Sequence, residues 1–159
     1  MPEDTQAQEP KANPKAAAGK PAGDKPAAKP AKEKPPALEA KPFQEFITQH
    51  FLPGLTKTME TLGVTDLNLA FDHKPLPIKG MEDTECWQVV GRFQSGQRQF
   101  MVGFLKDDLQ SPKVFSCADN GSKFSLLESF MIDERKVTLD LLLLYTVQRL
   151  NGQKWLTLN

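Results

Sequence analysis

The feature that most constrains this 159-residue chain is the position of its core-forming side chains. Residues 1–41 contain no aromatic residue and no Ile, Val or Cys, whereas every Phe, Trp and Tyr lies after Lys41. The same stretch carries eight Pro, eleven Ala and eight Lys, in units such as GKPAGDKPAAKPAKEKPP. This composition buries too little apolar surface to offset the entropy of ordering a chain. We therefore expect residues 1–41 to form a disordered, semi-extended tail.

Residues 42–159 suit a single folded domain with one hydrophobic core. The chain has 20 basic and 20 acidic residues, and the tail holds eight Lys against six Asp or Glu, so the domain is weakly acidic. Because nucleic-acid binding usually needs a concentrated basic surface, we expect no nucleic-acid partner. The longest apolar run, LDLLLLYTV, is broken by Asp140 and Thr146. It is far shorter than the roughly 20 residues that span a bilayer, which predicts no direct membrane insertion.

The ends of the chain and its cysteines bear on the compartment. The N-terminus lacks the charged-then-apolar order of a secretory signal, and it is too acidic for an organelle transit peptide. Cys86 and Cys117 are too few for a disulfide framework. These features favour a reducing, cytosol-like compartment.

Periodicity predicts one helix followed by about four strands. Apolar residues recur with helical spacing over 43–62, Pro53-Gly54 predicts a kink or two short helices, and Gly63 predicts the end. Alternation predicts a strand in DLNLAFDH (66–73) and a hairpin over 86–105 that turns at Ser95-Gly96. A further strand is predicted in KVFSC (113–117). The core face of the hairpin is expected to carry Trp87, Val89, Gly91, Phe93, Phe100, Val102 and Phe104.

Helical signals return after residue 121. Ser125 and Glu128 match a capping box for a short helical turn, SLLESFM. Asp133 is a candidate cap for a longer helix that runs to Leu150 and stops at Asn151-Gly152, and its apolar residues 141–144 predict a central position. The element order predicts an α+β domain, in which N-terminal and C-terminal helices pack on an antiparallel sheet of about four strands.

Several residues are candidates for a catalytic or metal site. A catalytic Cys117 needs a base, usually His, and the sequence places neither His50 nor His73 near it, so we favour a structural thiol. Single Cys and His residues lack the paired spacing of zinc or iron–sulfur sites, and Asp107-Asp108 lacks the regular ligands of a calcium loop. Paired carboxylates for acid–base work would come from Asp119, Glu128 and Glu134, but solvated charges are the favoured interpretation. We expect no cofactor.

The block DERK, residues 133–136, is the most informative surface feature. Acidic residues favour the first turn of a helix, which accounts for the two acids but not for Arg135 and Lys136. A mixed-charge rim beside a turn is also typical of a protein interface. The predicted partner-binding residues, with the hairpin edge around 92–99 as the second choice, are Asp119, Asn120, Asp133, Glu134, Arg135 and Lys136.

Three stretches together resemble the NdhV family, the subunit V proteins of the photosynthetic NAD(P)H dehydrogenase-like (NDH) complex of cyanobacteria and chloroplasts. These stretches are ECWQVVGRFQSGQRQF, FSCADNG and ESFMIDERKVTLDLLLLYTVQRLNGQKWL. The resemblance extends over residues 42–155 and includes the Lys/Ala/Pro-rich tail. The lack of a transit peptide favours the cyanobacterial type.

The resemblance implies a peripheral subunit on the hydrophilic arm, at the cytoplasmic side of the thylakoid membrane, near the region where ferredoxin docks. The complex passes electrons from reduced ferredoxin to plastoquinone and supports cyclic electron transport around photosystem I. By this resemblance the chain is not an enzyme itself, its partners are other subunits of the arm and ferredoxin, and its role is to stabilise the arm and assist ferredoxin binding. The alternative is a small thiol-dependent enzyme or redox sensor that uses Cys117.

Overall fold

The computed structural model of the chain describes residues 37–156. The prediction of a disordered tail therefore lies outside the described residues, except for residues 37–41. The helical segments are η1 (Leu38–Ala40), α1 (Phe43–Phe46), η2 (Ile47–Phe51), α2 (Leu52–Thr61) and α3 (Leu139–Gly152). The strands are β1 (Asn68–Pro75), β2 (Glu85–Phe93), β3 (Arg98–Phe104), β4 (Lys113–Asp119) and β5 (Glu128–Phe130).

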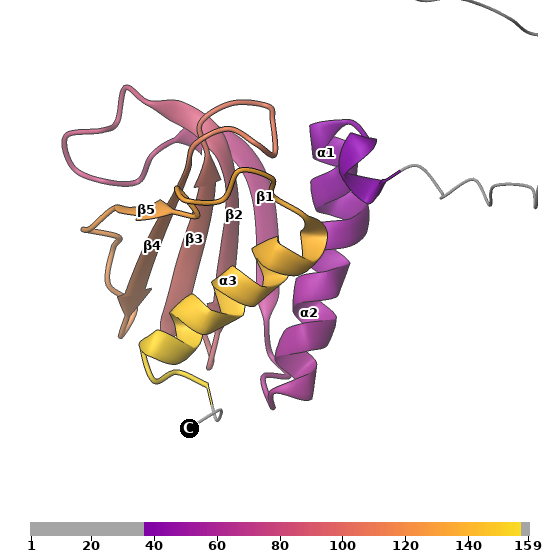
Figure 1. The fold of residues 1–159 in the computed structure, drawn as a ribbon. Coiled ribbons are helices and arrows are strands. Elements are labelled where there is room, and N and C mark those ends of the chain that lie inside the picture. Colours follow the sequence, from indigo (N-terminus) through magenta and orange to yellow (C-terminus); the bar gives the residue numbers. More distant parts are fainter. Residues whose placement is uncertain (1–36, 157–159) are drawn as a thin grey trace, which may run out of the picture. The chain divides into compact units, whose positions relative to one another are not determined.

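The five strands form one antiparallel sheet in which neighbours in sequence are neighbours in space, in the order β1-β2-β3-β4-β5. Figure 1 shows α3 crossing one face of this sheet, with α1 and α2 beside β1. The α+β class with N-terminal and C-terminal helices is therefore confirmed. The sheet has five strands where the sequence predicted about four.

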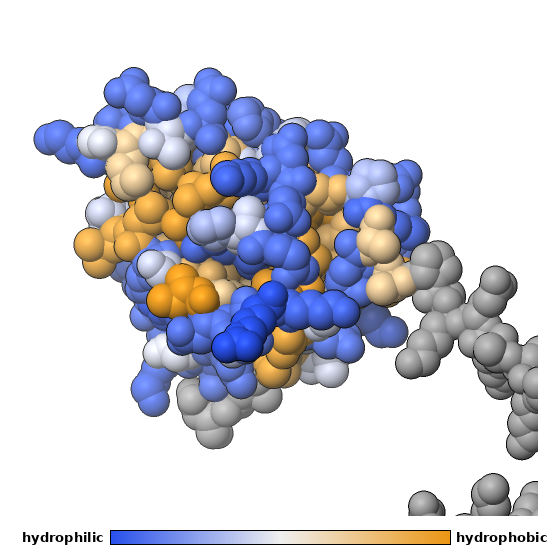
Figure 2. Space-filling view, turned by 45° about the horizontal axis from the view of Figure 1, so that its top comes forward, coloured by the Kyte–Doolittle hydropathy of each residue, from blue (hydrophilic) through white to orange (hydrophobic). Residues whose placement is uncertain are grey.

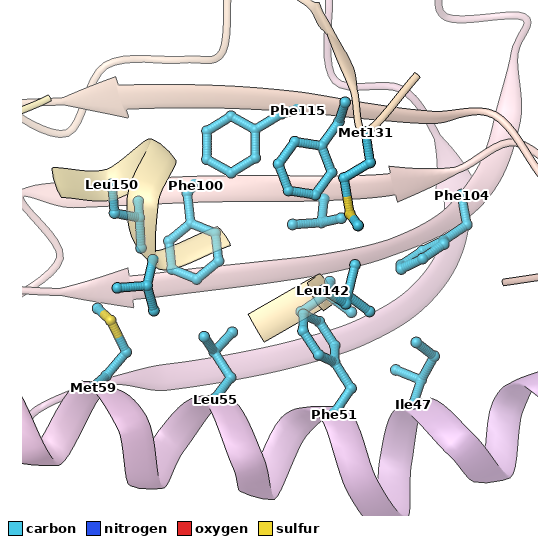
Figure 3. Close-up of a cluster of buried hydrophobic side chains, with 14 of the residues drawn as sticks. Ile47, Phe51, Leu55, Met59, Phe100, Phe104, Phe115, Met131, Leu142 and Leu150 are labelled. Atoms are coloured by element: carbon cyan, nitrogen blue, oxygen red, sulfur yellow. The ribbon is translucent and has the colours of Figure 1, made fainter. Parts of the chain in front are cut away.

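The first helix is continuous in direction but changes its winding. A five-residue π-helical segment, η2, separates α1 from α2 and ends just before Pro53. Proline lacks an N–H and clashes with the carbonyl of the residue four positions earlier, which here is Gln49, inside η2. At intervals of four residues this helix points Ile47, Phe51, Leu55 and Met59 into the core, as Figure 3 shows. It ends at Thr61, and the predicted stop residue Gly63 follows the C-cap Leu62 with φ of +87°.

The register of the hairpin sets the core face of the sheet. Trp87 lies opposite Phe104, Val89 opposite Val102, and Gly91 opposite Phe100, as the alternation predicted. A Cβ atom added to Gly91 would lie 2.2 Å from Cε1 of Phe100. The Phe100 ring therefore fills the space that a side chain at position 91 would occupy.

The predicted helical turn over residues 125–131 is wrong. Residues 122–127 form a loop, and residues 128–130 form β5, which pairs with the start of β4. Glu128 does not reach back to cap Ser125, because Arg149 on α3 holds its carboxylate in two hydrogen bonds of 2.6 and 2.7 Å. Pairing with the free edge of β4 and burial of Phe130 outweigh a short local capping signal, since tertiary context overrides propensity.

The predicted start of the last helix at Asp133 is also wrong. α3 begins at Leu139, and its N-cap is Thr138, whose hydroxyl accepts a hydrogen bond from the Leu141 N–H at 3.3 Å. Val137 is buried, and its backbone N–H and C=O both bond to the side chain of Gln110, at 2.7 and 2.9 Å. Since these bonds fix the chain ahead of Thr138, residues 133–136 stay outside the helix.

Apolar side chains are buried on both faces of the sheet. The larger cluster lies between the sheet and the helices, and Figure 3 labels ten of its residues. The smaller cluster lies on the other face, where the 76–84 and 121–127 loops bring Leu76, Ile78 and Phe124 onto Val90 and Met101. The predicted central place of α3 holds for its inner side, since Leu142 is buried while Leu144 is 49% exposed.

Candidate protein-interaction site

The segment 133–136 is held at both flanks. On its C-terminal side the Gln110 side chain binds both backbone groups of Val137. Further along, the Leu139 N–H donates to the carboxylate of Glu39 at 3.0 Å, and this bond lowers the pKa of Glu39 below its usual value. The exposed charges of this segment therefore sit on a fixed backbone.

The N-terminal flank turns sharply at Met131, which has φ of +55°. Side chains on a strand alternate between faces, yet Phe130 and Met131 are consecutive and both are buried. The left-handed conformation redirects the chain so that both side chains join the core. As a result Ile132, the next residue, is 70% exposed.

A hollow of about 400 Å³ lies between this segment and α3. Its lining includes Ile132, Glu134 and Tyr145, and the Tyr145 hydroxyl donates a short hydrogen bond to the Glu134 carboxylate. This bond raises the pKa of Tyr145. At the other end of the hollow, Arg149 holds Glu128, and this pairing lowers the pKa of Glu128 and raises that of Arg149.

The two cations of the segment differ from Glu134 in having no bonding partner. Glu134 is engaged by Tyr145, whereas Arg135 and Lys136 are exposed and make no hydrogen bond or ion pair within residues 37–156. On the face drawn in Figure 2, hydrophobic side chains reach the surface between hydrophilic ones. The combination of an exposed isoleucine with unpaired cations resembles the mixed surface of a protein interface.

The structure separates the six predicted partner-binding residues into two groups. Asp119 ends β4 and lies opposite Arg98, and Asn120 follows it in a tight turn with φ of +53°. Asp133 follows β5, whose Phe130 lies opposite Lys113 at the start of β4. The seven-residue strand β4 therefore separates the two groups by about 20 Å. They do not form one cluster.

Cys117 lies on the core face of β4 and is half-buried. Its sulfur accepts a hydrogen bond from the side chain of Gln153, which follows α3. His73 lies on β1 beside Trp87, with ring centroids 5.0 Å apart. β2 and β3 separate β1 from β4, and Cys117 lies four residues along β4 from Lys113, the residue in register with His73. His73 and Cys117 are therefore about 20 Å apart. His50 belongs to the first helix, where its ring lies 6.2 Å from that of Phe46.

The remaining polar candidates have structural partners. Asp107 accepts a 2.6 Å hydrogen bond from the indole N–H of Trp87, and the Asp108 carboxylate accepts one from the Gln110 N–H at 3.0 Å. Lys113 is buried, and its ammonium donates to the carbonyls of Leu109 and Ser111; burial lowers its pKa. Within residues 37–156 no group of three or more Cys, His, Asp and Glu side chains is placed to hold a metal ion.

Sequence reasoning missed a groove of about 1360 Å³ on the sheet face away from the helices. Alternate residues of β1 and β2 form its floor, among them Asn68, Ala70, Val90 and Arg92. The sequence offered one signal for it. The polar residues that alternate with apolar ones along β1 and β2 mark the sheet face without helices, but they do not show which loops fold over that face.

The described residues thus define a small two-layer α+β domain, with helices on one face of a five-stranded antiparallel sheet and a groove on the other. The chain belongs to the DUF2996 family, described as a protein of unknown function, which matches residues 37–157. No curated protein matches the chain. Every helix within the described residues is too short or too polar to cross a membrane.

Proposed function

We propose that this chain is a non-catalytic, NdhV-type peripheral subunit of the photosynthetic NDH complex. In this role it stabilises the hydrophilic arm at the cytoplasmic side of the thylakoid membrane and assists ferredoxin binding for plastoquinone reduction. The support from sequence is the resemblance over residues 42–155, which spans nearly the whole domain. The support from geometry is the 133–136 segment.

The carrying observation is the pair Arg135 and Lys136. Both are exposed, neither has a hydrogen-bond or ion-pair partner within the described residues, and the backbone beneath them is anchored through Val137 and Leu139. The neighbouring acids Asp133 and Glu134 do not lie in the first turn of a helix, because α3 begins only at Leu139. Interaction with the helix dipole therefore does not explain the charged block. Lys136 interacts with the Glu39 carboxylate only at longer range. Exposed cations on an anchored backbone attract an acidic partner such as ferredoxin and speed its approach.

The test is the double variant Arg135→Glu with Lys136→Glu in the tagged full chain. We expect weaker retention on the complex, or lower ferredoxin-supported plastoquinone reduction, by several-fold at moderate salt, since rim charges mainly change association rate and salt dependence. Affinity purification with mass spectrometry measures the first, and a reduction assay measures the second. Circular dichroism should show an intact fold, because exposed substitutions cost within about 0.5 kcal/mol.

The matched control is Lys57→Glu with Lys154→Glu, which makes the same charge change at exposed positions on α2 and beyond α3. This control should retain wild-type binding and activity. If the Arg135/Lys136 variant is folded, fully bound and fully active, the partner surface lies elsewhere on the domain.

A further inference from the structure

The groove on the open face of the sheet has walls that are held in place. The Gln99 side chain donates to the Ser122 carbonyl, and the Ser116 hydroxyl donates to the Leu126 carbonyl, which ties the 121–127 loop to the sheet. The opposite loop is closed by the Leu76 N–H, which bonds to the Thr84 carbonyl at 2.9 Å. Because both walls are anchored, the groove is preformed, and a ligand would not have to order it.

The floor of the groove is low and partly apolar. Ala70 on β1 lies opposite Val90 on β2, and the small alanine is exposed. Ile78 and Phe124 line the groove from the two loops, but they are only 6% and 8% exposed because they pack on the sheet. A ligand that fits this floor must therefore bring apolar groups of its own.

The groove has more basic than acidic residues, and the acidic ones already have partners. Its lining carries four basic residues and two acidic ones. Asp72 is paired with Lys74 at 3.0 Å, and the Glu82 carboxylate accepts a 2.8 Å hydrogen bond from the Gly80 N–H.

Three cations remain without a hydrogen-bond or ion-pair partner in residues 37–156. They are Lys79 on one loop, Arg92 on β2 and Lys123 on the other loop. A ligand with anionic groups would therefore pair with these free cations.

We propose that the groove binds an acidic segment of a partner protein. Its apolar side chains rest against Ala70 and Val90, and its carboxylates pair with Lys79, Arg92 and Lys123. This surface lies on the face opposite α3 and does not rest on the function proposed for residues 133–136.

Other occupants fit the observations less well. A small anion would leave most of the groove empty, because small-molecule pockets are usually about 300–1000 Å³. A second copy of the chain in a two-fold dimer would bring identical cations together, since such an interface uses the same patch twice. Residues 1–41 have eight Lys against six Asp or Glu, so their net charge has the same sign as the free cations.

The test uses the full chain and three labelled peptides of equal length in fluorescence anisotropy. One alternates Glu with Leu, the second replaces each Glu by Gln, and the third replaces each Glu by Lys. We expect only the Glu peptide to bind, with an affinity that falls as salt rises. The triple variant Lys79→Glu, Arg92→Glu, Lys123→Glu should weaken this binding by about tenfold or more, a loss of about 1.4 kcal/mol.

The matched control reverses three cations outside the groove, Lys57, Lys106 and Lys154, and should change the affinity less than about twofold, since these charges are distant and screened. In NMR titrations the amide signals of Ala70, Val90 and Gln99 should shift on binding. If the triple variant loses its fold by circular dichroism, the single variants Lys79→Glu and Lys123→Glu, both on exposed loops, serve for the same comparison.

Three results would overturn the proposal. The first is equal binding of the Glu and Gln peptides, and the second is Glu-peptide binding that the charge reversals leave unchanged. The third is a concentration-dependent dimer, seen by light scattering, that the triple variant abolishes; this would assign the groove to a second copy.

Discussion

Gly91 is a position where one absent side chain determines the packing of the sheet. The Phe100 ring occupies the place of its Cβ, which would lie 2.2 Å from Cε1 and 2.3 Å from Cζ of that ring. Phe100 is fully buried, so its ring can move away only by displacing other core side chains or by changing rotamer. We predict that Gly91→Ala lowers the free energy of unfolding by about 1–3 kcal/mol, the usual cost of overpacking a core.

Urea denaturation followed by circular dichroism measures this effect. Gly152→Ala is the matched control, because its Cβ would meet only an atom of Arg149, at 3.9 Å, and alanine favours a helix over glycine. The control should be as stable as the wild type or slightly more stable. Equal stability of Gly91→Ala would mean that the Phe100 ring has another rotamer available.

Cys117 offers the residue-scale test of the thiol alternative. Its sulfur is half-buried and accepts a hydrogen bond from Gln153, a contact that a serine oxygen can replace. We predict that Cys117→Ser leaves assembly of the complex and ferredoxin-dependent plastoquinone reduction nearly unchanged. A folded, bound variant that has lost this activity would instead support chemistry at Cys117.

At the scale of elements, α3 has an unusual cap. Two side chains cap its first turn. The carboxylate of Glu39 accepts a hydrogen bond from the Leu139 N–H, and the Thr138 hydroxyl accepts one from the Leu141 N–H. A negative charge at this end also interacts favourably with the helix dipole. The Gln oxygen can still accept the bond from the Leu139 N–H, so Glu39→Gln removes only the charge, and we predict that it lowers the free energy of unfolding by about 0.3–1 kcal/mol at pH 7.

The same bond makes the effect depend on pH. It lowers the pKa of Glu39 in the folded protein below the usual 4.5. The stabilisation is therefore fully present above the unfolded pKa and is lost as pH falls through the folded pKa. The difference between wild type and Glu39→Gln, measured by urea denaturation, should shrink below about pH 4.5, whereas Glu60→Gln, at an exposed position, should show no such trend. A difference that stays constant down to pH 3 would contradict the role of the charge.

The elements with strong periodicity could be predicted, and those defined by contacts could not. The hairpin was correct in face and turn, because alternation over many residues carries its own register. β5 has only three residues, and its signal is the open edge of β4, which no local pattern reveals. The start of α3 depends on Gln110 binding Val137 across 27 positions, so the nearer Asp133 gave a misleading cap.

The candidate sites follow the same rule. Charge pattern alone identified Arg135 and Lys136, because the mixed-charge block 133–136 is visible in sequence; that they have no hydrogen-bond or ion-pair partner within residues 37–156 came from the structure. It also grouped them with Asp119 and Asn120, which lie at the far end of β4. The groove cations Lys79, Arg92 and Lys123 are far apart in sequence, and only the folding of two loops over the sheet brings them to one groove.

At the scale of the whole molecule, composition divides the chain before residue 42, while the described structure begins at residue 37 and includes Glu39. We predict that deleting residues 1–36 changes the free energy of unfolding by less than about 0.5 kcal/mol, since that composition has little apolar surface to bury. Thermal unfolding of the full and shortened chains measures this difference. A clear loss of stability would show that the deleted residues contribute to the core.

The bond between Glu39 and Leu139 joins residues 100 positions apart. The element that Glu39 caps is also the last in chain order among the described residues, and it supplies Leu142 and Leu150 to the core. A ribosome-bound chain that ends after β5 would therefore present the inner face of its sheet to solvent, with apolar residues such as Phe100 and Phe115 uncovered on the side that α3 crosses. Such exposed apolar surface is prone to aggregation. Completion of the domain must await the synthesis of α3, and we expect nascent chains stalled before residue 139 to be substrates for chaperones.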